Sequence, residues 1–379
     1  MSSPTRRALY GIHSYAGLVF GVYLFLLCLS GTLVVFRDEL RVWGTPALRE
    51  LHFDGKQSAS LDRIVETFSA RYELSEPKLF AFRLPSSEHP FYELLLPRAG
   101  RGLVHAYAHP LSGEYLGEAR VQLGDFLFQL HANLSLRKKL GRYLVGAGGL
   151  ALMLLVLTSL VLHRTMFREL FTMRWSGARR AVASDGHKAA GTWMLPFHFI
   201  IALSGTFLAL KDLFVLVPAL AIYDGDLRRA RAELTEAPIV AQGIQTEMAS
   251  LDVMLASARN ETPELRPTLV VLHEWGDVRA RVDLAGSLPG HLLPKNEAVR
   301  YRFRGRDGQR VERRHGLHHG PWLRIADAMS PLHYGDFGNR WLRLMYFFGG
   351  LCALTLTFTG TLMWLERVQR RLARPRNGQ

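Results

Sequence analysis

The sequence lacks the residues that build several common kinds of site. Its 379 residues include only two cysteines, Cys28 and Cys352, which lie far apart in apolar stretches and form no Cys-x-x-Cys pair. A disulfide-stabilised secreted fold and covalent c-type haem attachment are therefore excluded. The motifs GxGxxG, GxxxxGK[ST], GxSxG and HExxH are also absent. Nucleotide binding and common hydrolase chemistry thus have no support.

Charged residues are missing from four long stretches. These stretches contain 29, 21, 22 and 22 residues without Lys, Arg, Asp or Glu, and they follow Arg7, Arg142, Lys188 and Arg343. A hydrocarbon core about 30 Å thick is crossed by about 20 apolar residues. The sequence therefore predicts four transmembrane helices near residues 15–36, 143–163, 189–210 and 344–365. The first stretch is too long for a signal peptide and lacks a small-x-small cleavage site.

Basic residues gather at one set of span ends. The segments before the first span, between the second and third, and after the fourth carry 13 basic and 3 acidic residues. The positive-inside rule makes these segments, and both termini, cytoplasmic. Most of the net charge of +14 thus indicates membrane topology, and we expect a membrane protein that binds no nucleic acid.

The two segments on the other side, 37–142 and 211–343, each resemble a helix followed by strands. LDRIVETFSARY (61–72) and LDVMLASAR (251–259) are helix-like, and each precedes short apolar or alternating runs. We expect a mainly α membrane protein with four transmembrane helices in two parallel repeats, each repeat carrying a small α+β periplasmic domain. The expected boundaries are 1–36 (first transmembrane helix), 37–125 (first periplasmic domain), 126–163 (interfacial helix and second transmembrane helix), 164–188 (cytoplasmic loop), 189–212 (third transmembrane helix), 213–330 (second periplasmic domain), 331–365 (fourth transmembrane helix) and 366–379 (cytoplasmic tail).

An internal repeat supports this organisation. His13, Ala16, Gly17, Leu29, Ser30, Gly31 and Thr32 recur at a constant offset of 174, as His187, Ala190, Gly191, Leu203, Ser204, Gly205 and Thr206. Leu130-His131 recurs as Leu332-His333, and Gly148-Gly149-Leu150 recurs as Gly349-Gly350-Leu351. Because both repeats start on the same side of the membrane, the axis that relates them runs along the membrane normal.

Six of the fifteen histidines lie in or at the ends of the predicted spans. His13, His163 and His187 lie near the inner face, and His131 and His333 lie near the outer face. His198 follows His187 by eleven residues, which places it about 16 Å deeper in a continuous helix. Ionisable side chains inside a membrane are costly and usually functional. The alternative is that the terminal histidines bind headgroups or backbone.

The histidines favour haem ligation over other metal sites. Neutral imidazole is a common axial ligand of haem iron. No span carries a carboxylate near its middle, which disfavours zinc, di-iron and proton-relay sites. Gly17, Gly21 and Gly191 share the helix face of His13 or His187 and leave room for a flat macrocycle, although such spacing also suits helix packing.

We expect two stacked haems. One would draw its ligands from His13, His163 and His187, and the other from His131, His198 and His333; the pairing stays open. In the outer segment, His315, His318 and His319 of HGLHHG could bind a metal, but an exposed polar loop is the favoured interpretation.

Five sequence segments resemble those of a known family. IHSYAG, LSGTLVVFRDEL, LHANLSL, PLHYGDFGNR and TGTLMWLER together resemble the PepSY-associated transmembrane proteins of bacterial inner membranes, and the likeness covers nearly the whole chain. Within that family the likeness is to di-haem ferrisiderophore reductases. The resemblance implies two non-covalent b-type haems that pass electrons to a ferric siderophore in the periplasm, releasing Fe(II) for uptake.

The resemblance also ranks the ligands and the partners. It implies His13, His131, His187 and His333 as the main haem ligands, with His163 and His198 at less general positions. It further implies a hydroxamate-type siderophore and a cytoplasmic or quinol electron donor. The main alternative is a PepSY-type sensor that binds a siderophore or peptide without redox activity. A proton-coupled siderophore transporter is disfavoured by the lack of membrane carboxylates.

Overall fold

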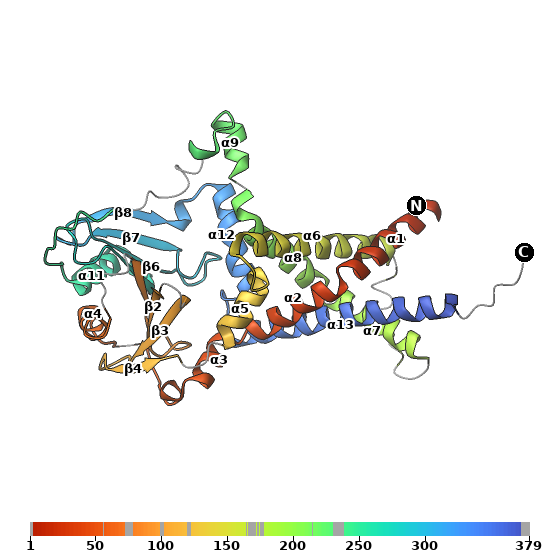
Figure 1. The fold of residues 1–379 in the computed structure, drawn as a ribbon, viewed down its shortest axis with the longest axis horizontal. Coiled ribbons are helices and arrows are strands. Elements are labelled where there is room, and N and C mark those ends of the chain that lie inside the picture. Colours follow the sequence, from red (N-terminus) through yellow and green to blue (C-terminus); the bar gives the residue numbers. More distant parts are fainter. Residues whose placement is uncertain are drawn as a thin grey trace, which may run out of the picture. The chain divides into compact units, whose positions relative to one another are not determined.

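A computed structural model describes residues 3–55, 57–72, 79–98, 102–119, 123–163, 165, 172, 174, 178–213, 215–229 and 239–372. The chain divides into two compact units, whose elements are labelled in Figure 1. The helical unit comprises Met1–Arg37, Gly124–Val217 and Leu332–Gln379. The sheet unit comprises Asp38–Leu123 and Pro218–Pro331.

The helices of the helical unit match the four apolar stretches. Three of them are long and apolar enough to cross a membrane: α6 (Lys138–Leu162), α8 (Leu195–Leu210, prolonged to Leu213 by the short turn η2) and α13 (Arg340–Leu372). The bent pair α1 (Ser3–Val19) and α2 (Gly21–Val34) makes a fourth span if it is counted as one. The described part of the chain therefore holds three or four membrane-spanning helices.

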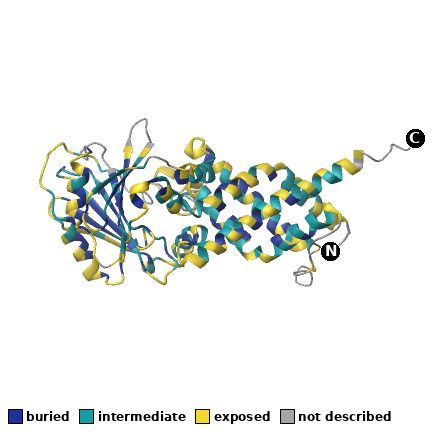
Figure 2. Cartoon of the chain, turned by 90° about the horizontal axis from the view of Figure 1, so that it is seen from below, coloured by how far each residue is buried: buried dark blue, intermediate teal, exposed yellow. Residues whose placement is uncertain are grey.

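Several shorter helices precede or follow these long helices in the chain. They are α5 (Leu123–Asn133), α7 (Arg179–Trp193), α9 (Leu216–Ile222) and α12 (Pro321–Tyr334). Many large apolar side chains on the spans are exposed, among them Val22 and Phe358. Figure 2 shows many exposed residues, in yellow, on helices of the chain. Such an apolar outer surface is what a lipid environment requires.

The first and third spans are broken, whereas the sequence predicted continuous helices. The axes of α1 and α2 differ by 64°, and the break falls at Phe20, just before Gly21. Helix α7 ends before Met194, and Pro196 lies in the first turn of α8. Proline has no N–H and its ring clashes with the preceding turn, so it can begin a helix but not continue one.

At each of the two breaks, the chain changes the helix against which it packs. Before its break, α1 packs mainly on α6, and α7 packs on α13. After the break, α2 packs mainly on α13, and α8 packs on α6. Each broken span therefore contacts the second span of its own half first and that of the other half next. This exchange holds the two halves of the helical unit together.

The sheet unit contains one sheet where the sequence predicted two small domains. Its eight strands are β1 (Leu79–Arg83), β2 (Tyr92–Arg98), β3 (Gly102–Ala108), β4 (Tyr115–Glu118), β5 (Arg266–His273), β6 (Arg281–Ser287), β7 (Val299–Arg304) and β8 (Arg310–His315). Their order is β4-β3-β2-β1-β5-β6-β7-β8, and every pairing is antiparallel. Strands β1 and β5 join the halves, because pairing satisfies the open edge that each four-stranded sheet would otherwise expose.

Two helices cover the sheet and cap each other. In α4 (Leu61–Ser69), Asp62 accepts a hydrogen bond of 2.7 Å from the backbone N–H of Leu251. In α11 (Leu251–Glu261), Asp252 accepts one of 2.9 Å from the N–H of Leu61. Free N–H groups at helix starts need such acceptors. The expected helix-then-strands order of each outer segment is thus confirmed, with the two halves sharing one core.

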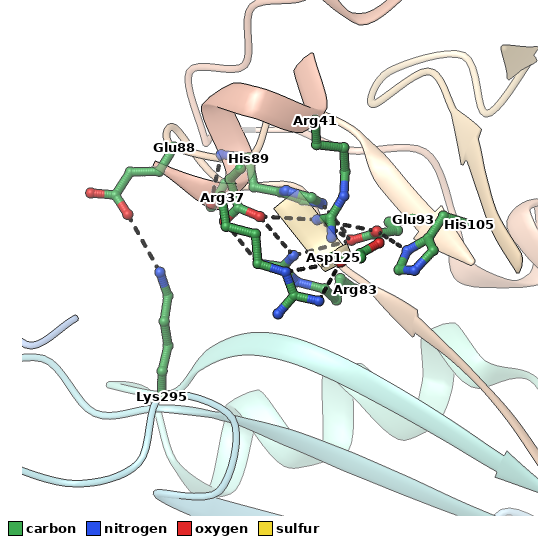
Figure 3. A network of polar contacts seen from close by, with 11 residues as sticks. Arg37, Arg41, Arg83, Glu88, His89, Glu93, His105, Asp125 and Lys295 are labelled. Atoms are coloured by element: carbon green, nitrogen blue, oxygen red, sulfur yellow. Dashed lines mark hydrogen bonds and ion pairs between the residues drawn. The ribbon is translucent and has the colours of Figure 1, made fainter. Parts of the chain in front are cut away.

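A buried ionic cluster ties α3 (Arg37–Gly44) to the first half of the sheet (Figure 3). Glu93 on β2 is fully buried and lies 3.2 Å from Arg41 of α3 and 3.1 Å from Arg83 of β1. His105 on β3 lies 2.6 Å from the same carboxylate, and His89 lies 3.5 Å from it. The hydrogen bond from His105 and the two arginines outweigh burial and lower the pKa of Glu93 to about 2.

We predict that Glu93→Gln strongly destabilises the sheet unit. Removing the fully buried carboxylate leaves Arg41 and Arg83 with only the partly exposed Asp38 as an anionic partner, at a cost of about 3 kcal/mol. That cost corresponds to a fall of roughly 10 °C in the unfolding midpoint, measured by circular dichroism on the detergent-solubilised chain. The matched control is Glu88→Gln, because Glu88 forms an exposed pair with Lys295 that contributes less than about 1 kcal/mol. Equal shifts for the two variants would refute the prediction.

We also predict that His89 makes the sheet unit acid-sensitive. Burial, followed by the charge of Arg83, lowers the pKa of His89 to about 3. Between about pH 6.5 and 3 the unfolded chain binds this proton and the folded chain does not, so stability falls as the pH falls. Glu93 acts in the same direction, but only below its ordinary pKa of about 4.5. His89→Leu should therefore flatten the stability profile between about pH 6.5 and 4.5, whereas His52→Leu, an exposed control, should not.

Candidate functional site

The inner pair of repeated histidines is anchored in the same way in both halves. The Nδ1 atom of His13 lies 2.8 Å from the hydroxyl of Thr158, and that of His187 lies 2.9 Å from the hydroxyl of Thr359. Each threonine hydroxyl also bonds to a carbonyl one turn earlier in its own helix, that of Leu154 or Thr355. The two contacts join α1 to α6 and α7 to α13.

The outer pair, His131 and His333, lies together elsewhere in the helical unit. Their ring centroids are 5.9 Å apart, and the ring planes differ by 21°. The Nδ1 atom of His131 lies 3.0 Å from the carbonyl oxygen of Leu27. The Nδ1 atom of His333 lies 3.2 Å from the hydroxyl of Ser204, which donates to the carbonyl of Ile200.

Glycine is required where these outer rings touch the spans. A Cβ atom on Gly31 would lie 2.7 Å from Cε1 of His131, and one on Gly205 would lie 2.7 Å from Cε1 of His333. Carbon atoms do not approach each other this closely without displacement. The recurring Leu-Ser-Gly-Thr segment therefore supplies both a flat surface and, at Ser204, an acceptor for the histidine.

Four of the six histidines line one cavity of about 750 Å³ in the helical unit: His13, His163, His187 and His198. Gly17, Gly21 and Gly191 also line it, as expected for glycines on the face of the histidines. Its walls are otherwise mainly apolar. Five basic side chains lie among its lining residues: Arg6, Arg7, Arg180, Lys188 and Arg367. The cavity thus combines apolar walls, imidazoles and positive charge.

His198 lies in this cavity and not with the outer histidines, where the sequence analysis had grouped it. The predicted depth of His198 requires a continuous helix from His187, whereas the helix is broken at Met194, between α7 and α8. The His198 side chain is 2% exposed, and its Nε2 atom has no hydrogen-bond partner among the described residues. A buried polar atom without a partner is unfavourable, so its position favours a ligand in the cavity.

The HGLHHG segment is held by local contacts. His315 accepts a hydrogen bond from the N–H of Leu317, and its ring stacks on His318 at 4.7 Å. His319 lies 2.7 Å from Asp327 of α12. Among the described residues, no group of three or more His, Cys, Asp or Glu side chains is placed to hold a metal ion. His315 ends β8, Gly316–His318 form the short turn η3, and only His318 of the three histidines is exposed, so the segment is not simply the exposed loop that the sequence favoured.

Sequence reasoning missed the partners of the histidines. Thr158 and Thr359 differ by 201 positions, the offset that relates Gly148-Gly149-Leu150 to its repeat. The signal was therefore present, but a threonine in an apolar helix usually bonds to its own backbone and has no evident function. Only the packing of α1 on α6 and of α7 on α13 brings these hydroxyls to the imidazoles.

We predict that Gly31→Ala and Gly205→Ala each displace the adjacent imidazole and destabilise the helical unit by about 1–3 kcal/mol through overpacking. Gly11→Ala is the control, because a Cβ there meets nothing within 4 Å. Thermal unfolding of the three purified variants gives the comparison. An unchanged midpoint for Gly31→Ala and Gly205→Ala would show that the rings are not held against these glycines.

Comparison with known proteins places the chain in a family. The sequence profile described as the PepSY-associated TM region matches residues 10–367. An uncharacterized protein of Pseudomonas aeruginosa is 31% identical over 252 residues, which make up 64% of this chain. The chain spans 63% of the length of that relative, a little under two thirds. With the profile matched over nearly its whole length, this protein belongs to the PepSY-associated transmembrane family.

Proposed function

We propose that this protein is a haem-containing reductase of the bacterial inner membrane that passes electrons across the bilayer to a ferric siderophore in the periplasm, releasing Fe(II). The observation that carries the proposal is the cavity of about 750 Å³ lined by His13, His163, His187 and His198. Four imidazoles in one largely apolar cavity, one of them with an unpartnered Nε2, form a donor set suited to haem iron.

The residues of the cavity fit a haem in three respects. Its volume lies within the range of about 300–1,000 Å³ that is usual for small-molecule sites. Gly17, Gly21 and Gly191 give it flat surfaces. Its basic lining residues, such as Arg180 and Arg367, suit the two carboxylates that a haem carries. These features together favour haem over a bare metal ion.

The outer pair is the proposed position of a second haem. His131 and His333 would hold this haem, since imidazole is a common ligand of haem iron and the two ring centroids are only 5.9 Å apart. Both rings have an acceptor at Nδ1, which leaves Nε2 for coordination. Haem at each place would supply one-electron transfer, the chemistry that the protein side chains lack.

Two parallel repeats and cytoplasmic termini belong to the same proposal. The equivalent contacts support the repeats, since His13–Thr158 matches His187–Thr359 and Gly31–His131 matches Gly205–His333. The excess of basic residues before the first span, between the second and third, and after the fourth supports the orientation. With this orientation, the cavity and its basic residues lie toward the cytoplasmic side, where the electron donor would act.

The chemistry of the substrate explains why one electron is enough. Hydroxamate oxygens are hard donors that bind Fe(III) strongly and Fe(II) much more weakly. Reducing the bound ferric ion therefore loosens it without breaking a covalent bond of the siderophore. The role of this chain is to hold the imidazoles in place and to keep water away from them.

We predict that protein purified from haem-replete cells is red, with a Soret band, dithionite-sensitive α and β bands, and two haems per chain. His13→Leu and His187→Leu should each lower the haem content by removing a ligand from the cavity, and His131→Leu and His333→Leu should do so at the outer pair. His52→Leu, in the sheet unit, is the control and should leave the spectrum unchanged. Colourless wild-type protein would favour the alternative of a sensor without redox activity. Unchanged spectra in all four ligand variants would redirect the assignment to His163 and His198.

A further inference from the structure

We infer that Thr158 and Thr359 are positioning residues that fix the tautomer of His13 and His187, so that each Nε2 presents its lone pair to the cavity. The inference deepens the proposed function, because it names the residues that prepare two of the haem ligands. Neither threonine is among the residues that line the cavity, so each acts through its histidine.

The hydrogen bonds of the hydroxyls set the direction of the contact. The single O–H hydrogen of Thr158 is directed to the carbonyls of Leu154 and Leu155, at 2.7 and 3.0 Å. That of Thr359 is directed to the carbonyls of Thr355 and Leu356, at 2.5 and 3.4 Å. A hydroxyl has only one hydrogen to donate, so toward the imidazole each oxygen is an acceptor. The Nδ1 atoms of His13 and His187 must then carry the proton.

The backbone groups near the rings also favour a proton on Nδ1. The backbone of Leu155 is within hydrogen-bonding reach of the His13 ring, and that of Leu356 is within reach of the His187 ring. These two positions lie within helices and offer carbonyl oxygens, which only accept. The backbone near each ring therefore adds an acceptor, and no donor, to the surroundings of the imidazole.

The opposite tautomer would be unfavourable at this place. It would place the lone pair of Nδ1 against a lone pair of the threonine oxygen, because the hydroxyl hydrogen is already donated to the backbone. The contact would then lose its hydrogen bond, at a cost of about 1–3 kcal/mol. With the proton on Nδ1, Nε2 instead carries the lone pair that a metal ligand needs. In metal sites, a bond of this kind orients the ring and raises its basicity.

The test replaces each hydroxyl by a methyl group of similar shape. Thr158→Val and Thr359→Val remove the hydroxyl acceptor, whereas Thr158→Ser and Thr359→Ser retain it. The matched control is Thr361→Val, because Thr361 lines the cavity and bonds to the carbonyl of Thr357 but, among the described residues, makes no hydrogen bond to a histidine. Thermal unfolding of all five variants confirms that each is folded.

Two measurements on the purified full-length chain decide the inference. In haem-free protein, ¹⁵N NMR of labelled histidine should show the Nδ1–H form of His13 and His187, assigned by the signals that are missing in His13→Leu and His187→Leu. Other rings with an acceptor at Nδ1, such as His131 and His333, should give further signals of this form. The His13 signal should be lost in Thr158→Val and the His187 signal in Thr359→Val, and both should be retained in the serine variants and in Thr361→Val. In haem-loaded protein, transfer to apomyoglobin should reveal haem affinity about ten- to a hundredfold weaker in each valine variant. The reduction potential of the haem should also rise, because a less basic imidazole stabilises Fe(III) less.

The outcomes separate this inference from the proposed function. Unchanged tautomers in both valine variants would overturn the inference even if the wild-type protein is red. Colourless wild-type protein would overturn the proposed function, and the NMR comparison on the haem-free chain would still decide the role of the threonines. Loss of the Nδ1–H form in Thr361→Val as well would also overturn the inference, since it would show a general change in packing.

Discussion

The helical unit depends on one constraint: every imidazole inside an apolar bundle needs an acceptor for its N–H. The Nδ1 atoms of His13 and His187 each face a threonine hydroxyl on a neighbouring helix, that of His333 faces Ser204, and that of His131 faces the carbonyl of Leu27. Water is excluded from such sites, so an unmet donor has no substitute partner. These bonds fix which helices lie next to each other and which ring nitrogen remains for a ligand.

The breaks in the first and third spans allow both sets of contacts to form. A straight helix would follow one neighbour throughout, whereas α1–α2 and α7–α8 each pack on one second span and then on the other. The break also brings His198, four residues beyond Met194, to the cavity that His13 and His187 line. Local irregularity at Gly21 and Pro196 therefore determines the composition of the candidate site.

In the sheet unit, too, segments from the two halves of the sequence pack against each other. Strands β1 and β5 join two four-stranded sheets, and α4 and α11 cap each other through Asp62 and Asp252. The buried Glu93 cluster then fixes α3, which follows the first span in the chain, against this sheet. A charge buried this deeply tolerates only one arrangement of its partners, which makes the position of α3 specific.

The four apolar stretches, the repeat, the family and the six candidate histidines could be predicted from the sequence alone. Each of them is evident from composition or from regular spacing. The helix-then-strands order of the outer segments also followed from local patterns. The joined sheet, the broken spans, the place of His198 and the threonine partners were decided only by tertiary structure. The physical reason is that an open strand edge, a proline turn and a hydroxyl each have several possible partners, and only packing between segments distant in the chain selects one.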